Sequence, residues 1–255
     1  MNKRIILMGL MILLLASSAA YATVFDMKYL AEGSSTLKTK DKSSDKHLWQ
    51  STITTKKIKY QGKDFLYAVD SGSGIWGKDK KPKTWRTESY ALIQGNRIIP
   101  YSVKVVFKDK QGKVLRQLEK FYDLEKKKVF CDDNGKAKKY DFKDDLLDKE
   151  FMGVAQSNYP FAAKKDYIYH ILTHEPTLYK ITLKYRGKEV LRTQGKEIEC
   201  HKIQMIPDLG ALNIFGAFVP KTYFWYETKP PHEFVRYEGL ESGLGTPYVV
   251  MEAVD

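Results

Sequence analysis

Alternation of apolar and polar side chains along most of the chain is the feature that most restricts its fold. In residues 179–186 the odd positions are apolar and the even positions are polar or charged. The segments 103–107 and 248–254 repeat the pattern. A period of two residues is typical of a β-strand that has one face in the core and the other in water.

Turn residues separate these segments at short intervals. Gln61-Gly62, Asn134-Gly135 and Gln194-Gly195 are pairs of the kind that tolerates the positive φ of tight hairpins. Strands joined by such turns are antiparallel neighbours, and about a dozen of them are predicted. The sequence therefore predicts a mainly β fold: a large curved antiparallel sheet, a half-barrel or barrel-like meander, with one or two short helices.

Four segments depart from the alternation. Asp144 or Asp145 is placed to cap a short helix that reaches Met152. A second helical turn is predicted at residues 167–172, a mobile loop in the Ser/Thr/Lys-rich run 33–46, and an irregular apolar loop at 207–219. Strands and helices do not alternate, which argues against a parallel nucleotide-binding sheet.

The first residues have the layout of a secretory signal peptide. Lys3 and Arg4 precede an apolar run, and small residues end at Ala22. The apolar run is shorter than the roughly 20 residues that cross a bilayer. We therefore predict a signal peptide over residues 1–22, cleavage between Ala22 and Thr23, and a single β domain over residues 23–255 that is periplasmic or secreted.

The chain is basic, with a formal net charge of +12. Its lysines are interleaved with acids and turn residues, a pattern typical of solvated strand ends. Nucleic acid is not predicted as a partner, because an exported protein seldom meets it and no recognition motif accompanies the charge. Peripheral contact with an anionic membrane surface is the better alternative.

Two cysteines, Cys131 and Cys200, would enter an oxidising compartment after export. Their spacing is not that of a zinc or redox motif. Two alternatives stay open at this point: a disulfide between strands that are neighbours in the sheet, or two unpaired buried thiols.

No motif predicts catalysis. The glycine spacing at residues 72–77 matches a dinucleotide fingerprint, but no helix is predicted to follow it. His170 and His174 would share one face of a helix, yet spacing marks no third metal ligand. A serine with His201 or His232 would lack the strand-to-helix elbow that exposes a nucleophile. We therefore predict no catalytic residue, no metal site and no cofactor.

Aromatic residues give the stronger indication of a site. Tyr223-Phe224-Trp225-Tyr226 places rings on both faces of one predicted strand. One pair is then core, and the other either packs against a second layer or lines a pocket for an apolar ligand. The candidate ligand-binding residues are Tyr223, Phe224, Trp225, Tyr226, Trp85 and Tyr90.

The second half of the chain resembles a known family. The motifs are Gly-Lys-Glu-Val at 187–190, Gly-Lys-Glu-Ile-Glu-Cys-His-Lys-Ile at 195–203, Tyr-Phe-Trp-Tyr at 223–226 and Pro-His-Glu-Phe-Val-Arg-Tyr-Glu-Gly at 231–239. They resemble exported bacterial β proteins grouped as domain of unknown function 3108. The resemblance implies a periplasmic antiparallel β protein without established catalytic residues. The outline is also similar to curved-sheet lipoprotein carriers of the envelope, by analogy of fold alone.

Three functions are compatible with these observations. The leading hypothesis is a non-enzymatic envelope protein that binds an apolar or lipid-like ligand in a curved sheet. The second is a structural or assembly factor that contacts another envelope protein. The third is a hydrolase. A deep apolar cavity would favour the first, a flat exposed aromatic patch the second, and converging histidine and carboxylate groups the third.

The cleavage site is directly testable. We expect the exported form to begin at Thr23, because small residues at positions 20 and 22 precede that bond. N-terminal sequencing of the mature protein checks this. A start more than a few residues away would contradict it.

Overall fold

The structure is a computed structural model, and it describes residues 25–254 except 78–79, 209, 211–219 and 244. The signal cleavage site and most of the predicted 207–219 loop lie outside these residues. The first group of strands is β1 (Gly33–Asp41), β2 (His47–Tyr60), β3 (Lys63–Ile75), β4 (Pro82–Gln94), β5 (Arg97–Lys108), β6 (Val114–Asp123), β7 (Lys128–Asp133) and β8 (Lys136–Asp141). The second group is β9 (Leu146–Asp148), β10 (Tyr167–Leu172), β11 (Leu178–Thr193), β12 (Lys196–Pro207), β13 (Thr222–Glu227), β14 (Phe234–Leu240) and β15 (Tyr248–Val254).

Short helical segments complete the described chain. They are the 3₁₀ turns η1 (Met27–Tyr29), η2 (Lys149–Phe151) and η3 (Phe161–Ala163), and the α-helix α1 (Met152–Ser157). In the part of the chain that the structure describes, no helix is long and apolar enough to cross a membrane. The predicted mainly β fold with one or two short helices is confirmed.

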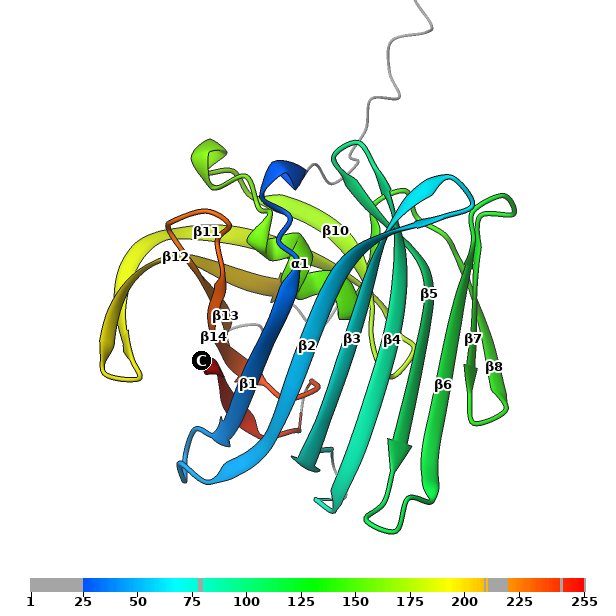
Figure 1. The fold of residues 1–255 in the computed structure, drawn as a ribbon, viewed down its shortest axis with the longest axis horizontal. Helices are drawn as coiled ribbons and strands as arrows, with labels where there is room; N and C mark the ends of the chain where they lie inside the picture. The colour runs from blue at the N-terminus through cyan, green and yellow to red at the C-terminus, as the bar shows by residue number, and fades with distance from the viewer. Residues whose placement is uncertain (1–24, 78–79, 209, 211–219, 244, 255) are drawn as a thin grey trace, which may run out of the picture.

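All fifteen described strands belong to one sheet, made of two meanders. In the first, β1 to β8 follow one another; in the second, β9 to β15 do, and β1 pairs with β15 to join them. Every pair is antiparallel except β9 with β10. The sheet is thus a nearly unbroken series of sequential hairpins (Figure 1).

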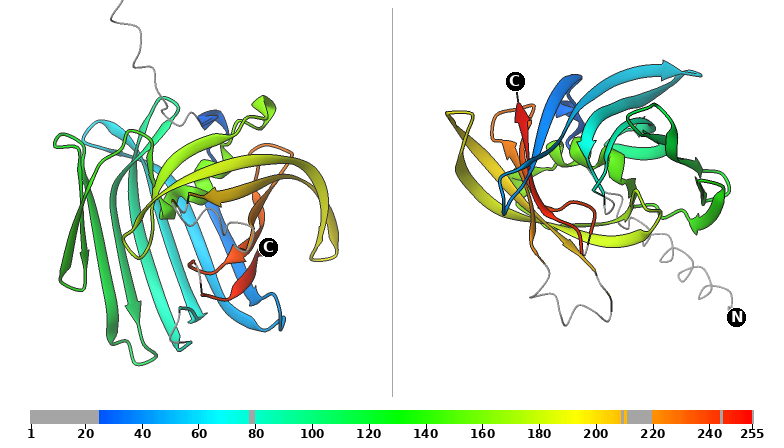
Figure 2. Two further views of the ribbon diagram at one scale, coloured as in Figure 1. Left: turned by 180° about the vertical axis from the view of Figure 1, so that it is seen from behind. Right: turned by 90° about the horizontal axis from the view of Figure 1, so that it is seen from below.

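The sheet curls until its two edges approach each other. β8 forms one edge and β9 the other, yet only residues 142–145 connect them. So short a connection, five Cα–Cα steps, spans at most roughly 18 Å. Seen from below, the strands form an open ring around α1 (Figure 2, right). The fold is therefore barrel-like rather than a flat sheet.

The predicted hairpin turns are confirmed by their backbone angles. Gln61, Asn134 and Gln194 have φ of 50°, 54° and 51°, and the glycine after each also has positive φ. Two consecutive positive φ values match the right-handed twist of the flanking strands.

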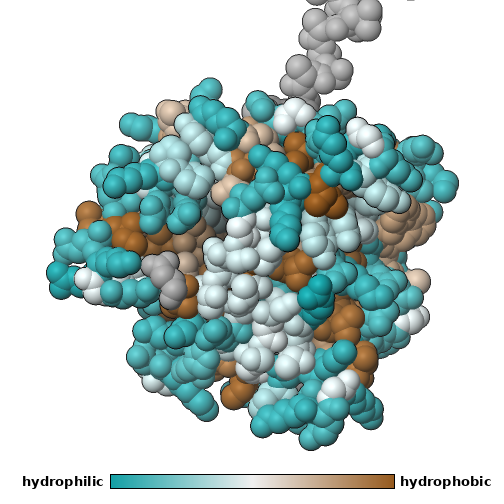
Figure 3. All heavy atoms as spheres, viewed as in Figure 1, coloured by the Kyte–Doolittle hydropathy of each residue, from teal (hydrophilic) through white to brown (hydrophobic). Residues whose placement is uncertain are grey.

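The convex face of the sheet is mostly hydrophilic where Figure 3 displays it, with small apolar areas.

Three local predictions were wrong. Residues 167–172 form β10 rather than a helical turn, since all six residues pair with β11. The run 33–46 contains β1, which is held between β2 and β15. The helix begins later than predicted, because Leu146–Asp148 extends as β9 and Asp148, rather than Asp144 or Asp145, caps the turn that follows.

A buried ion pair ties the edge strand β9 to β6, which lies two strands in from the other edge. Lys120 on β6 points inward and donates to Oδ2 of Asp148 at 2.7 Å, and both side chains are fully buried. The Tyr122 hydroxyl donates to the same oxygen, while Oδ1 accepts from the backbone N–H of Glu150 at 2.9 Å. Asp148 therefore both pairs with Lys120 and begins η2.

The cysteines do not meet. Cys131 lies on β7 and Cys200 on β12, and neither strand is a neighbour of the other in the sheet. Both are free thiols in the structure, and both are buried. Burial raises the pKa of Cys131 to about 11 and that of Cys200 to about 12. The prediction that the two cysteines lie on neighbouring strands is therefore wrong. The structure favours the alternative of two unpaired buried thiols.

We expect two thiols to react with a disulfide reagent once the unreduced protein is unfolded, and close to none in the native state. Reactivity requires the thiolate, which burial disfavours. Ellman titration with and without denaturant checks both values. A result of zero in the unfolded, unreduced protein would establish a bridge instead.

Replacing Lys120 should strongly destabilise the fold. Lys120→Met leaves the Asp148 charge buried without its partner, which costs about 3–5 kcal/mol of unfolding free energy. Lys104→Met is the matched control, because Lys104 forms a half-exposed pair with Glu119 at 2.8 Å and its loss should cost less than about 1 kcal/mol. Urea denaturation followed by tryptophan fluorescence measures both; equal effects would refute the special role of the buried pair.

Candidate functional site

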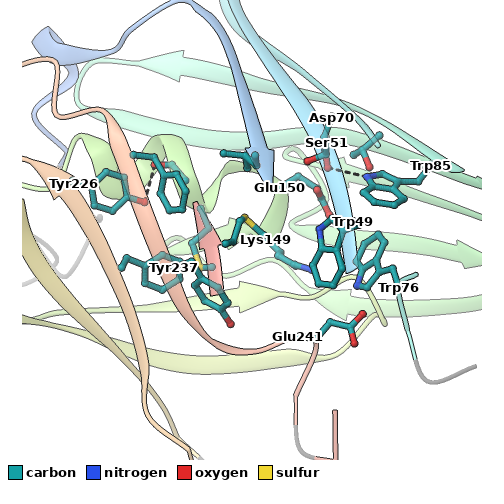
Figure 4. Close-up of a pocket in the computed structure, with 17 residues that line it drawn as sticks. Trp49, Ser51, Asp70, Trp76, Trp85, Lys149, Glu150, Tyr226, Tyr237 and Glu241 are labelled. Atoms are coloured by element: carbon teal, nitrogen blue, oxygen red, sulfur yellow. Dashed lines mark hydrogen bonds between the residues drawn. The ribbon is translucent and has the colours of Figure 1, made fainter. Parts of the chain in front are cut away.

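The curled sheet leaves a cavity of about 220 Å³ on its concave side. Strands β1–β4 form one wall, β13–β15 form the other, and η2 with the start of α1 closes it from the interior. In Figure 4 three tryptophans lie on one side, and Tyr226 and Tyr237 lie on the other. Most of the lining is aromatic or aliphatic.

The tryptophan wall is built by Trp49 on β2, Trp76 directly after β3, and Trp85 on β4. The ring of Trp76 lies 6.2 Å from that of Trp49 and 5.0 Å from that of Trp85. Gly72 lies under Trp85, because a Cβ at this position would come within 2.2 Å of the indole. The glycines that resembled a nucleotide loop therefore belong largely to β3, where the missing side chain makes room for a tryptophan.

The aromatic strand β13 has a defined orientation. Phe224 and Tyr226 point inward and line the cavity, and the Tyr226 hydroxyl donates to Gln156 of α1 at 2.9 Å. Tyr223 and Trp225 point outward, where Lys202 lies 4.6 Å and 4.9 Å from their ring centres. The Trp225 indole N–H donates to Glu189 on β11. Of the four predicted ligand-binding residues on this strand, the inner pair reaches the cavity.

Trp85 and Tyr90 lie on opposite faces of β4. Trp85 lines the cavity, whereas Tyr90 packs against Tyr67 of β3 with ring centres 4.8 Å apart. The two residues are five positions apart, and side chains an odd number of positions apart in a regular strand point to opposite faces. Tyr90 is accordingly an outer-face residue.

One carboxylate in the cavity is incompletely satisfied. Asp70 Oδ2 accepts a hydrogen bond from the Trp85 indole at 3.1 Å. Its Oδ1 is buried and accepts no hydrogen bond of ordinary geometry among the described residues, although the Ser51 hydroxyl lies near enough to lower the pKa of this carboxyl. Burial, and next the neighbouring charge of Glu150, raise the pKa of Asp70 to about 6. Asp70 therefore changes its charge near neutral pH.

Glu150 forms a second polar group beside the cavity. It accepts from Nδ1 of His174 at 3.0 Å. Burial alone would raise the pKa of Glu150, but the hydrogen bond and charge of His174 hold it below its ordinary value. Burial in turn lowers the pKa of His174.

The other histidines considered in the sequence analysis, His170, His201 and His232, contact residues outside the cavity. His170 lies on β10 and bonds to Asp145 at 2.9 Å, so it does not share a site with His174. His201 stacks on Phe161 at 4.0 Å, with His232 5.5 Å from it. Within the described ranges, no hydrogen bond reaches Nε2 of His174, and no cluster of histidine, cysteine and acidic residues fits a metal ion. A nucleophile–base pair of the hydrolase kind is not formed at His174 among these residues.

Several cavity residues were missed by sequence reasoning. They are Trp49, Trp76, Asp70, Lys149, Glu150 and Glu241. Trp49 and Ser51 lie on the same face of β2, and Trp85 and Thr87 on the same face of β4. This period of two was a usable signal for the tryptophan wall, whereas the pairing of Gly72 with Trp85 is known only from the structure.

Comparisons with known proteins address the fold. No protein-family profile matches the sequence, and no curated protein matches it. The chain is similar in structure to a β-barrel-like protein of domain of unknown function DUF1849 from Brucella abortus, with a TM-score of 0.54 and 8% identity over 89% of this chain and 97% of that chain.

Two further structures are more distant. One is a protein with a YmcC-like fold from Bacteroides fragilis, with a TM-score of 0.34 and 12% identity over 90% of this chain and 97% of that chain. The other is the hypothetical lipoprotein YmcC from Escherichia coli, at 0.29 and 7% over 89% and 88%. At these TM-scores neither structure is used as evidence of a shared fold. The chain thus shares a β-barrel-like fold with the Brucella protein, and its place in the domain of unknown function 3108 family stays a prediction from the sequence.

Proposed function

We propose that this protein is an exported, non-enzymatic binding protein that holds an apolar or lipid-like ligand in the cavity of its curled sheet. Export rests on the predicted signal peptide at residues 1–22. Ligand binding rests on one observation: the concave side of the sheet retains a cavity with a largely aromatic lining instead of being filled by core side chains.

The cavity's size limits the ligand. Its volume of about 220 Å³ lies below the roughly 300–1,000 Å³ of sites that enclose drug-sized molecules. One water takes up about 30 Å³ of liquid, and a methylene group needs similar room. The cavity therefore suits a ring system or a chain of a few carbons, not a whole two-chain lipid.

A row of aromatic residues on the outer face supports a second candidate, contact with another envelope protein. The rings of Tyr67 and Tyr90 lie 4.8 Å apart, those of Tyr101 and Phe121 lie 6.0 Å apart, and Phe121 pairs with Phe130 across strands. Phe121 and Phe130 are exposed. Aromatic residues are enriched at protein interfaces. This function would not depend on the cavity.

Filling the cavity at Gly153 tests the leading proposal. Gly153 of α1 lines the cavity, and a Cβ added there meets no atom within 4 Å. Gly153→Phe should fold, since most residues favour a helix over glycine by about 0.5–1 kcal/mol. Its ring should occupy the space and weaken binding of 2-naphthol, a small uncharged fluorescent dye with two rings, by about tenfold or more.

Gly153→Ala is the matched control and should bind the dye as the natural protein does. Dye titration gives the affinities, and thermal unfolding shows that all three proteins are folded. Equal dye affinity for the natural protein and Gly153→Phe would contradict binding in the cavity and leave the outer row as the better candidate.

A further inference from the structure

The charges around the cavity differ from those of the rest of the protein. Three carboxylates line it, Asp70, Glu150 and Glu241, and Lys149 is the one basic residue among its lining side chains in the described structure. The chain as a whole has a formal net charge of +12. The cavity is therefore a locally acidic place in a basic protein.

The aromatic wall adds to the same preference. The faces of tryptophan rings attract cations more strongly than those of other aromatic side chains. Trp76 lies between the other two tryptophans of this wall, with its ring centre 6.2 Å from that of Trp49 and 5.0 Å from that of Trp85. The ammonium of Lys149 already lies 5.5 Å from the centre of the Trp76 ring, so the geometry accepts a positively charged nitrogen.

Asp70 supplies a group that a cation would complete. Its Oδ1 is buried and accepts no hydrogen bond of ordinary geometry among the described residues, while Trp85 holds Oδ2 in place. A buried carboxylate oxygen that lacks a partner is costly to the fold. A positively charged ligand beside Trp85 would offset part of that cost by direct attraction.

We propose that the cavity selects a cationic amphiphile, an ammonium group on an apolar chain, with the positive end between the tryptophan wall and Asp70 and the chain against Phe224 and Tyr226. This deepens the proposed function and rests on it, because it names the class of ligand for the same cavity. A fatty-acid carboxylate paired with Lys149 would have the opposite charge and would face three carboxylates.

Titration of Asp70 gives the preference a dependence on pH. The charged groups that act on Asp70 are Glu150 and Lys149 from η2, with His174 bonded to Glu150. Glu241 from the β14–β15 connection lines the same cavity beyond the tryptophans (Figure 4). Because the pKa of Asp70 is raised to about 6, its carboxylate is ionised at pH 7.5 and largely protonated at pH 5. Binding of a cation should therefore weaken as the pH falls through 6.

The test compares three ligands with one short chain: pentylammonium, pentanoate and pentanol. Calorimetry with the full mature chain at pH 7.5 should give an affinity for the ammonium about tenfold or more above that for pentanoate. At pH 5 the ammonium should bind several-fold more weakly, while pentanol should be unchanged. Asp70→Asn should reduce the ammonium preference and keep pentanol binding, and Glu119→Gln, which removes an outer-face charge, should change neither.

Each result has a defined meaning. Pentanoate binding as tightly as the ammonium, or an ammonium affinity independent of pH, overturns the preference for cations while pentanol binding still supports an apolar cavity. Failure of all three ligands to bind overturns the proposed function itself. The comparison of ligands uses the natural protein, so it holds even where Asp70→Asn does not fold.

Discussion

The buried pair of Lys120 and Asp148 is the interaction on which the rest of the structure depends. A sheet curled into an open ring leaves its concave side exposed unless something crosses the opening. Asp148 on the edge strand β9 reaches across to Lys120 on β6, two strands in from the other edge, and at the same time starts η2, which places Lys149 and Glu150 beside the cavity. Charges in a low-dielectric interior tolerate little displacement, so this contact fixes position more than it adds stability.

Features encoded locally could be predicted from the sequence, and features that need distant partners could not. Period-two segments and Gln-Gly or Asn-Gly turns identified the strands and hairpins, because each depends on neighbours in the chain. β10 was mistaken for a helical turn, since a six-residue apolar segment fits either period and only its pairing with β11 decides. For β13, alternation predicted two aromatic pairs, but the sheet's curvature determines that Phe224 and Tyr226 face inward.

The fold alone does not identify a ligand. The Brucella protein shares the barrel-like arrangement at 8% identity, and a likeness of this kind describes the fold and not the site. That information lies in side chains such as Asp70 and Trp76, which come from separate strands and meet only after the ring forms. An aspartate on a strand is usually solvated, and for this reason sequence reasoning passed over it.

The seam between β1 and β15 has a consequence for the order of assembly. Leu37 pairs with Ala253, although their positions lie at opposite ends of the described chain, whereas nearly all other strands pair with the one just before or after them. A chain that emerges from its N-terminus can complete the first meander through short-range contacts before its last strands emerge. The tryptophan wall is then formed but open to water until β13–β15 supply the opposite wall of the cavity. Shortening the chain by the length of β15 would leave most hairpins able to form, yet it would remove the step that encloses the cavity.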